Sequence, residues 1–294
     1  MRLIAFLITV LISFNIFAGD EQKVKKTIIE KTTAGASNFI ANLIDGDGDT
    51  EVQITAGEDY KPEYSIMTVR PIAIHHSVDV VFVQLQINDT KIRGDNRLTI
   101  NSGIGYRKLS NDKSSFTGSN IFIDYDEEGN SRASIGLELR ASSFEALANY
   151  YQAISGGKKV GNFTERALDG TEISLIGQLP YIPWASIVAN TYEWKANKNS
   201  KNSKGDKISL ELLLTPNLIV DLGYDNNNID GTSNFVKVMF VYPPRKKASA
   251  KTDFISKTPF VKIDMSDQLL TKVRRTNKIV VESENSGFVM ARGN

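Results

Sequence analysis

The sequence lacks the residues on which most chemical sites depend. It has no cysteine and only two histidines, His75 and His76, among 294 residues. The absence of cysteine excludes a disulfide scaffold, a thiolate metal site and a cysteine nucleophile. Two histidines leave little material for a histidine-rich metal centre or a histidine-based catalytic site. The informative feature is therefore the pattern of the chain.

The chain also lacks an excess of charge of either sign. Lys and Arg number 35 against 34 Asp and Glu, a net charge of +1. The basic excess of a nucleic-acid-binding protein is missing, so we expect no nucleic-acid partner. Hydrophobic residues make up 41% and charged residues 23% of the chain, which excludes a disordered protein and a multi-helix membrane protein.

One long apolar run is present, at the N-terminus. Residues 3–17 are almost wholly apolar apart from Ser13 and Asn15, follow Arg2, and lead to the small residues Ala18 and Gly19. A short positive start, an apolar run and a small residue at its end predict a secretory signal peptide over residues 1–18. The run is shorter than the roughly 20 residues of a transmembrane helix. We therefore expect an exported chain that is neutral after cleavage.

Apolar and polar residues alternate with a period of two through most of the chain, which predicts strands with one apolar and one polar face. The pattern is clearest at 97–107, 132–140, 207–214 and 218–225. Weaker versions lie at 51–56, 63–70, 79–87, 115–126, 142–154, 168–179, 185–194 and 233–242. The chain is thus expected to form twelve strands.

Two architectures use such strands: a soluble sandwich, whose apolar faces form the core, and a transmembrane barrel, whose apolar faces meet lipid. Glycine and charge on the polar faces favour the barrel, as does a strand length near the 9–11 residues that cross a bilayer. The connections also alternate in length, as in outer-membrane barrels. Short turns are expected at 108–114, 141, 180–184 and 216–217, and longer loops at 88–96, 155–167, 195–206 and 226–232.

We therefore predict an all-β fold, a twelve-stranded antiparallel transmembrane β-barrel over residues 51–242 in the outer membrane. Residues 19–50 form an N-terminal segment with a short helix, because Val24, Ile28 and Ile29 recur at helical spacing. Residues 243–294 form a C-terminal linker and a short remnant. Outer-membrane lipid and lipopolysaccharide are the expected surroundings.

The polar faces of the strands predict which charged side chains line the lumen. Apolar positions such as Ile100, Ile135, Leu137, Leu210, Leu212 and Leu222 should face lipid. Since a charge facing lipid is costly, the charged positions should face inward. The predicted lumen-lining residues are Arg97, Arg107, Asp124, Glu138, Arg140, Glu172, Glu211 and Asp221.

Other motifs have plain structural interpretations. Residues 45–49 (DGDGD) resemble the front of a calcium loop, but Thr50 and Ala56 stand where such a loop needs Gly and Glu, so we expect a turn and no metal. His75 and His76 follow Pro71 and are expected in a turn rather than in a catalytic site. No catalytic residue and no cofactor are predicted, and the protein is not expected to be an enzyme.

Two further patterns concern the membrane. Lysines between 195 and 207 could contact lipopolysaccharide, or simply occupy a solvated loop. Alternating Val236, Val238, Phe240 and Tyr242 resemble the last-strand signal read by the barrel-assembly machinery, although lipid packing explains them equally. Aromatic residues near strand ends suggest an interfacial girdle: Trp184, Trp194, Tyr106, Tyr125, Tyr181 and Tyr242.

The order of residues resembles the barrel of the intimin and invasin family, the inverse autotransporters, from about residue 36 to 242. The collinear motifs are 98–107 (LTINSGIGYR), 118–126 (GSNIFIDYD), 131–138 (SRASIGLE), 165–170 (ERALDG) and 179–183 (LPYIP). The resemblance implies a twelve-stranded barrel, a helix near the periplasmic mouth, and a linker that returns through the pore to carry an adhesive passenger. Residues 275–282 look like the start of the family's first extracellular region.

The expected function is an anchor or translocator that displays a short C-terminal segment at the cell surface, linked to adhesion to an unknown surface receptor. The alternative is a small pore or structural barrel without a passenger. An even number of strands leaves Tyr242 at the periplasmic face. The resemblance favours a tail that threads the lumen, with residues 251–263 packed on its glycine-rich wall, and such threading would indicate an anchor rather than a free channel.

Overall fold

The computed structural model describes residues 47–57, 60–75, 78–92, 95–198, 201–283 and 287–289. The predicted signal peptide and most of the predicted N-terminal helical segment lie outside these residues.

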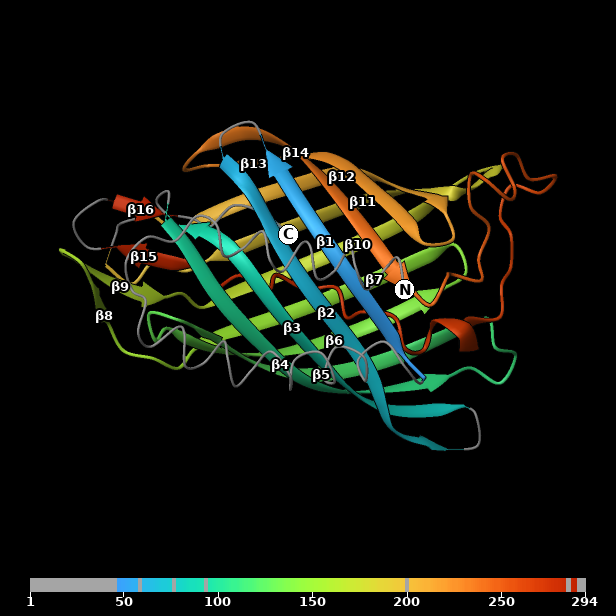
Figure 1. The fold of residues 1–294 in the computed structure, drawn as a ribbon, viewed down its shortest axis with the longest axis horizontal. Coiled ribbons are helices and arrows are strands. Elements are labelled where there is room, and N and C mark those ends of the chain that lie inside the picture. The colour runs from blue at the N-terminus through green and yellow to red at the C-terminus, as the bar shows by residue number, and fades with distance from the viewer. Residues whose placement is uncertain are drawn as a thin grey trace, which may run out of the picture. The chain divides into compact units, whose positions relative to one another are not determined.

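The main body is a closed barrel in which each strand pairs antiparallel with its neighbours (Figure 1). Strand β1 pairs with β14, from Thr50 opposite Tyr242 to Gly57 opposite Phe235, and this pairing closes the sheet. The prediction of twelve antiparallel barrel strands is confirmed. They are β1 Asp49–Gly57, β2 Tyr60–His75, β3 Asp79–Ile92, β4 Asp95–Leu109, β5 Ser115–Asp126, β6 Ser131–Ala141, β7 Phe144–Ala153, β10 Gly170–Leu179, β11 Ile182–Trp194, β12 Ser203–Thr215, β13 Leu218–Asn227 and β14 Gly231–Tyr242.

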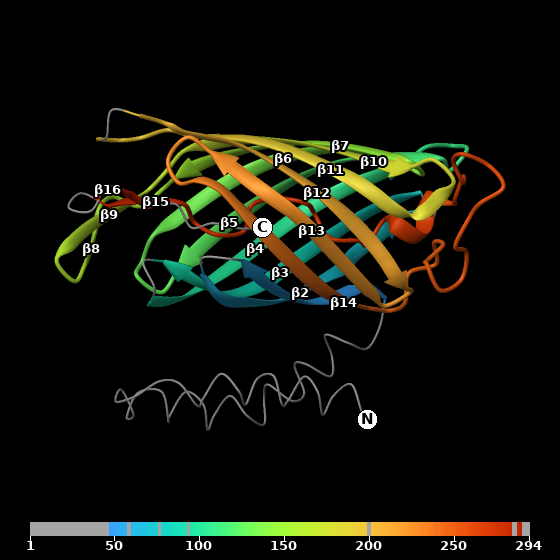
Figure 2. The same ribbon diagram turned by 90° about the horizontal axis from the view of Figure 1, so that it is seen from above.

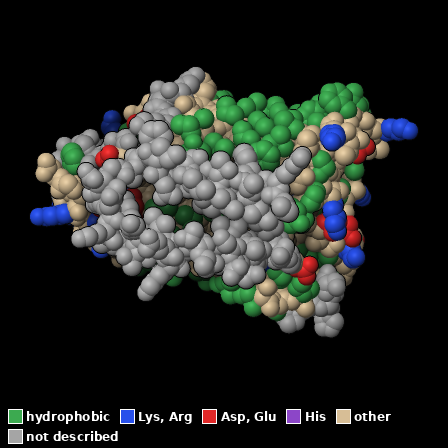
Figure 3. All heavy atoms as spheres, viewed as in Figure 1, with side chains coloured by type: hydrophobic (Ala, Val, Ile, Leu, Met, Phe, Trp, Pro, Cys, Tyr) green, Lys and Arg blue, Asp and Glu red, His purple; other side chains and the backbone are tan. Residues whose placement is uncertain are grey.

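The two faces of the wall differ as the alternation predicts. In β4, buried and exposed residues alternate along nearly the whole strand, and its outward Ile100 is 47% exposed. Leu137 of β6 is 62% exposed, while its neighbour Glu138 is buried. On the visible wall in Figure 3, hydrophobic side chains cover much of the surface between the two ends, where charged side chains gather. An apolar outer band with polar ends is the surface that a bilayer requires.

Several strands are longer than the sequence predicts. Strand β2 continues past Pro71 to His75, with a shift of register between Pro71 and Ala73 that accommodates the missing donor of proline. His75 therefore ends a strand, whereas the sequence placed it in a turn. Strands β3 and β4 pair out to Ile92 opposite Asp95, so the loop expected at 88–96 is mostly strand. The loop expected at 226–232 shrinks to residues 228–230 for the same reason, because the sheet extends beyond the apolar band.

The barrel has two mouths, named here by the segments that border them. The proximal mouth, where β14 ends at Tyr242, carries the turns at 110–114, 142–143, 180–181 and 216–217. The distal mouth carries the segments 127–130, 154–169, 195–198, 201–202 and 228–230. At the proximal turn 110–114, hydroxyl hydrogen bonds from Ser110 and Ser114 lower the pKa of Asp112 to about 2, and so stabilise the turn in its ionised form.

A second, small sheet lies at the distal mouth. It contains β8 Lys158–Val160 and β9 Phe163–Ala167 from the connection after β7, and β15 Val281–Ser283 and β16 Gly287–Val289 from the C-terminal tail, in the order β16-β15-β9-β8. These strands gather at one end of Figure 1. The tail also forms one short 3₁₀ helix, η1 Met265–Gln268, near the other end. The tail thus has contacts at both mouths.

Candidate functional site: the occupied lumen

The lumen contains the C-terminal tail. Residues 243–264, called the strap, fold at the proximal mouth, where Ser256 N donates to Tyr181 O and Tyr181 N donates to Pro259 O. Residues 269–281, called the lumenal segment, then run between the walls of the barrel to β15 (Figure 2). The chain therefore passes from the end of the last barrel strand through the lumen to the distal mouth.

An apolar cluster holds the tail where it enters the lumen. Met265, Leu269 and Val273 recur every four residues along the tail and pack against inward side chains of β2 to β5, among them Phe82 and Phe122. Glycine makes this packing possible: a Cβ on Gly105 would lie 2.3 Å from Phe82, and one on Gly103 would lie 2.4 Å from Phe122. The inward glycines of β4 leave the room that the aromatic rings and the tail occupy.

Above this cluster, two wall arginines bind the tail backbone. Arg107 Nη1 donates to Leu269 O at 2.8 Å and to Thr271 O at 2.6 Å, and Arg140 Nη2 donates to Lys272 O at 2.8 Å. Glu138 lies between the two arginines, 2.6 Å from Arg107 Nε and 2.8 Å from Arg140 Nη2. This shared carboxylate orients both guanidinium groups toward the carbonyls of the tail.

The centre of the lumen is organised by Asp124. Arg132 of the wall and Arg275 of the tail both bind it, each with an N–O distance of 2.7 Å, and none of the three side chains is exposed. Arg132 also donates to Thr276 O at 2.8 Å, and Asn101 donates to Asn277 O at 2.8 Å. One wall carboxylate thus fixes both a side chain and, through Arg132, the backbone of the tail.

Arg274 reaches both sides of the lumen. Its Nη1 and Nη2 form a bidentate pair with Glu211 of β12 at 2.7 and 2.9 Å, and its Nε lies 3.0 Å from Glu145 of β7. Lys272 pairs with Glu51 of β1 at 2.5 Å. These contacts connect the tail to strands from widely separated parts of the wall.

A further wall partner of the tail near the centre is Glu172. It accepts the hydroxyl of Tyr151 at 2.5 Å and the backbone N–H of Thr276 at 3.0 Å, and Asn190 donates to its other oxygen at 2.8 Å. The Thr276 N–H also donates to the Tyr151 hydroxyl at 2.8 Å, so Glu172 and Tyr151 together satisfy this buried tail amide.

At the distal mouth the tail becomes part of a sheet. Strand β15 pairs with β9, Val281 opposite Ala167, and Lys278 pairs with Glu63 of the wall. Arg97 of β4 connects β9 to the barrel: its Nη1 lies 2.5 Å from Glu165 of β9 and 3.5 Å from Asp126 of β5. The distal connection after β7 thus forms a surface on which the emerging chain is paired.

The structure buries all eight residues that the sequence places in the lumen. Seven of them take part in the contacts described above. The eighth, Asp221, pairs with Lys237 of the wall at 3.5 Å. The eight are Arg97, Arg107, Asp124, Glu138, Arg140, Glu172, Glu211 and Asp221.

Sequence reasoning missed the tail residues that meet these side chains. Lys272, Arg274, Arg275 and Lys278 each pair with a wall carboxylate. A signal was present: residues 269–281 contain four basic residues and no acidic one. Instead, residues 275–282 were assigned to an extracellular region, whereas most of them lie in the lumen and the rest at its mouth.

The segment expected to fill the lumen is also displaced along the chain. Residues 251–263 belong to the strap, where Phe254 is 64% and Ile255 72% exposed. Phe254 stacks on Trp184, with ring centroids 5.6 Å apart, and its carbonyl accepts the Trp184 indole N–H. The apolar residues of the strap therefore pack at the rim of the proximal mouth. The lumen contains the basic segment, whose side chains pair with the carboxylates of the wall.

Both tryptophans were wrongly assigned to an outer girdle. Trp194 is buried against Tyr151, Tyr192, Leu168 and Val280 inside the distal mouth. Trp184 packs at the proximal mouth on an inward cluster that includes Leu213 and Met239. Strand ends face both lipid and lumen, so position near an end does not decide the direction of the ring. The tyrosines Tyr106, Tyr125, Tyr181 and Tyr242 are exposed.

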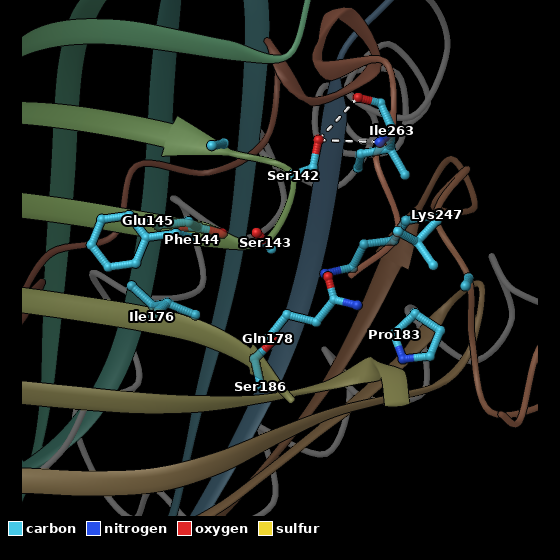
Figure 4. A pocket seen from close by; sticks show the side chains of 13 residues that line it. Ser142, Ser143, Phe144, Glu145, Ile176, Gln178, Pro183, Ser186, Lys247 and Ile263 are labelled. Carbon is cyan, nitrogen blue, oxygen red and sulfur yellow. Dashed lines mark hydrogen bonds between the residues drawn. The ribbon is translucent and has the colours of Figure 1, made fainter. Parts of the chain in front are cut away.

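The tail does not fill the lumen completely. A cavity of about 100 Å³ lies between the lumenal segment and the wall of β10 to β14 and β1, lined by charged side chains such as Glu211, Asp221, Lys207 and Lys237 and by apolar ones such as Phe235. A smaller one at the proximal mouth is shown in Figure 4, where Lys247 and Gln178 line the same space and Ser142 binds the backbone of Ile263 at 3.1 and 3.2 Å.

The other sequence motifs add no chemical site. Asp49, the last acid of the DGDGD motif, pairs with Arg245 at 2.7 Å, while Asp45 lies outside the described residues. Among the described residues, no group of three or more His, Asp or Glu side chains is placed to hold a metal. Within the same residues, no helix has the length and apolar character needed to cross a membrane. Lys207 of the lysine-rich region faces inward and lies 3.5 Å from Asp225.

These features define a class: an antiparallel transmembrane barrel of twelve strands whose own C-terminal tail occupies the lumen. A model of the family described as inverse autotransporter, beta-domain, matches residues 16–277. The chain belongs to this family and is an outer-membrane β-barrel of the inverse autotransporter type.

One solved structure shows the same fold. A membrane protein from a structure described as "Unveiling the Mechanism Behind the in-meso Crystallization of Membrane Proteins" is 20% identical, with a TM-score of 0.64 over 81% of this chain and 99% of that one. The KdgM porin is 7% identical over 65% of this chain and 98% of its own, with a TM-score of 0.45. No curated protein sequence matches this chain significantly.

Proposed function

We propose that the barrel anchors its own C-terminal chain in the outer membrane and presents it at the cell surface. The path of the tail carries this proposal: it leaves β14 at the proximal mouth, crosses the lumen, and joins β9 at the distal mouth. In this proposal the proximal mouth faces the periplasm. Adhesion would be a property of the displayed chain, and the barrel would hold and orient it.

The contacts along the path support an anchor rather than a free channel. The tail is bound at the proximal mouth by apolar packing, at the centre by Arg275 and Asp124, and at the distal mouth by strand pairing. Wall arginines and Glu172 bind its backbone as well as its side chains. Such contacts offset the entropy cost of ordering an extended chain, about 1–2 kcal/mol per residue.

The absence of cysteine makes the topology directly testable. Single cysteines introduced at Lys159, in the distal sheet, and at Ile255, on the strap, each provide one labelling position. We expect a membrane-impermeant maleimide to label K159C on intact cells and I255C only after the outer membrane is opened. A C-terminal epitope should behave like K159C. Labelling of I255C, but not K159C, on intact cells would overturn the proposed direction.

The barrel itself is proposed to catalyse no reaction. The polar side chains of the lumen are engaged in ion pairs and in binding the tail, and no nucleophile, base and orienting partner come together among the described contacts. Phospholipase activity of the purified barrel that is abolished by His75→Ala or His76→Ala would contradict this.

A further inference from the structure

The wall of the lumen, considered without the tail, is strongly acidic. Eleven carboxylates of the described barrel strands face inward, against six basic side chains. The carboxylates are Asp49, Glu51, Glu63, Asp124, Asp126, Glu138, Glu145, Glu172, Glu211, Asp221 and Asp225. The basic residues are Arg97, Arg107, Arg132, Arg140, Lys207 and Lys237.

The tail supplies the missing positive charge. Lys272, Arg274, Arg275 and Lys278 pair with wall carboxylates on β1, β2, β5, β7 and β12. Residues 269–281 contain no acidic residue. The positive charge of the lumenal segment therefore balances the negative charge of the wall. If this segment left the lumen, those carboxylates would face water.

A cavity lined in part by charged side chains already exists beside the tail. The cavity of about 100 Å³ is lined by Asp221, whose side chain is 8% exposed and whose Oδ1 has no hydrogen-bond partner among the described residues. Glu211 lies directly across from Asp221 in the β12–β13 pairing, and the tail's Arg274 neutralises it. Two adjacent carboxylates, one of them paired with the guanidinium group of a tail residue, form a place where a small cation would replace that group.

We propose that the lumen is a cation-selective pore and that the basic lumenal segment is its gate. Carboxylate-lined constrictions raise the local concentration of cations and exclude anions, because low-dielectric walls focus the field. When residues 272–278 leave the wall, monovalent cations should pass along the side of β10 to β14. The proposal concerns the charge of the lumen and holds for either direction of display.

A variant of the full chain tests the gate. K272Q/R274Q/K278Q removes three tail charges and keeps the buried Arg275–Asp124 pair, while K251Q/K257Q/K262Q removes three exposed strap charges as a matched control. In planar bilayers we expect the first variant to conduct, with a K⁺ to Cl⁻ permeability ratio of about threefold or more, and the control to stay closed like the parent. A folded first variant that stays closed, or prefers Cl⁻, would overturn the proposal.

The wall residues provide the complementary test. Adding E51Q, E63Q and E211Q to the tail variant removes one carboxylate partner of each of the three substituted tail residues and leaves Glu145, the second partner of Arg274, in place. Conductance should persist while the permeability ratio falls toward one. A ratio that stays unchanged would show that these carboxylates do not set selectivity. In the tail variant, selectivity should also fall in 1 M salt, where the Debye length is about 3 Å.

A second measurement avoids any risk that the substitutions impair folding. A protease site inserted after Ile255, in the exposed part of the strap, allows the folded full chain to be cut beside the barrel. After the tail is washed out in high salt, the pore should open and conduct cations. Adding a synthetic peptide of residues 264–283 should close it, and the same peptide with K272Q/R274Q/K278Q should not. Closure by both peptides would contradict a gate based on charge.

Discussion

Asp124 has no exposed side-chain surface and meets one arginine from the wall, Arg132, and one from the tail, Arg275. Both arginines also lie over aromatic rings, Arg275 at 4.4 Å from the Phe122 centroid and Arg132 at 4.4 Å from that of Tyr151. The carboxylate is thus the counterion of two buried cations, and each cation is further held by a ring face.

Replacing Asp124 by Ala should leave two buried guanidinium groups without a counterion. We expect the free energy of unfolding of the barrel to fall by about 3–5 kcal/mol, the typical result of breaking a buried pair from one side. Arg275→Met leaves the Asp124–Arg132 pair intact and should cost less. Urea titrations followed by the gel mobility of unheated samples would measure both, and equal losses would argue against this arrangement.

Leu137 and Glu138 are neighbours on β6: Leu137 faces the lipid and Glu138 faces the lumen. From the sequence alone, Leu137→Arg should impair assembly, because Arg facing the bilayer midplane costs about 2–4 kcal/mol, and Glu138→Gln should be mild. The structure changes the second expectation. Glu138 is the shared partner of Arg107 and Arg140, so Glu138→Gln removes the charge between two buried arginines.

Both substitutions should therefore reduce the folded fraction of the protein. They should differ in whether the tail of the folded fraction stays protected from protease. Glu138→Gln should expose the lumenal segment to protease in the fraction that folds, since Arg107 and Arg140 bind the backbone of residues 269–272. Leu137→Arg should leave the tail protected in its folded fraction. Gel mobility and limited proteolysis of the refolded proteins separate the two effects.

At the scale of single elements, β4 combines an outward lipid face with an inward face that glycine keeps open. Gly103 and Gly105 stand opposite Phe122 and Phe82, whose rings contact the tail cluster around Leu269. The strand itself follows directly from its alternating sequence. The reason for glycine at these inward positions becomes clear only with the tail in place.

Gly105→Ala should displace the Phe82 ring and loosen the proximal cluster. We expect a loss of about 1–3 kcal/mol in the free energy of unfolding, as for other overpacked sites, together with faster protease clipping near Leu269. Gly177→Ala on β10 is the matched control, because no atom lies within 4 Å of a Cβ placed there. Similar behaviour of the two variants would show that the close packing at Gly105 is not important.

At the scale of the whole molecule, the tail connects residues that are far apart in the chain. Lys272 pairs with Glu51 across a separation of 221 residues, and Asn277 Nδ2 donates to Gln86 Oε1 at 2.7 Å across 191. These contacts lie inside a wall whose strands each pair mainly with their sequence neighbours.

A chemical cross-link can test this arrangement in cells. Because the chain has no cysteine, Gln86→Cys and Asn277→Cys create one possible pair. We expect a short dithiol-specific cross-linker to join them and shift the mobility of the denatured protein. Gln86→Cys with Ile255→Cys should not react within one chain, because Ile255 lies on the exposed strap. A cross-link in the control pair, or none in the test pair, would contradict the path of the tail.

The sequence by itself determined the strands, their two faces and the class of fold. These depend on local alternation, which each strand carries within about ten residues and which a bilayer enforces through the cost of polar groups in lipid. It also placed eight charged residues on polar faces. The sequence did not determine where the strands end, because β2, β3 and β4 continue past the apolar band, where the alternation weakens.

Only the tertiary structure decided what fills the barrel. The sequence predicts that the apolar residues 251–263 of the strap pack in the lumen, yet the basic segment 269–281 occupies it. Its position depends on the summed charge of carboxylates from strands distant in sequence, and no local pattern expresses that sum. The same reason explains the two tryptophans: each ring turns inward because the closed wall and the tail offer it partners there.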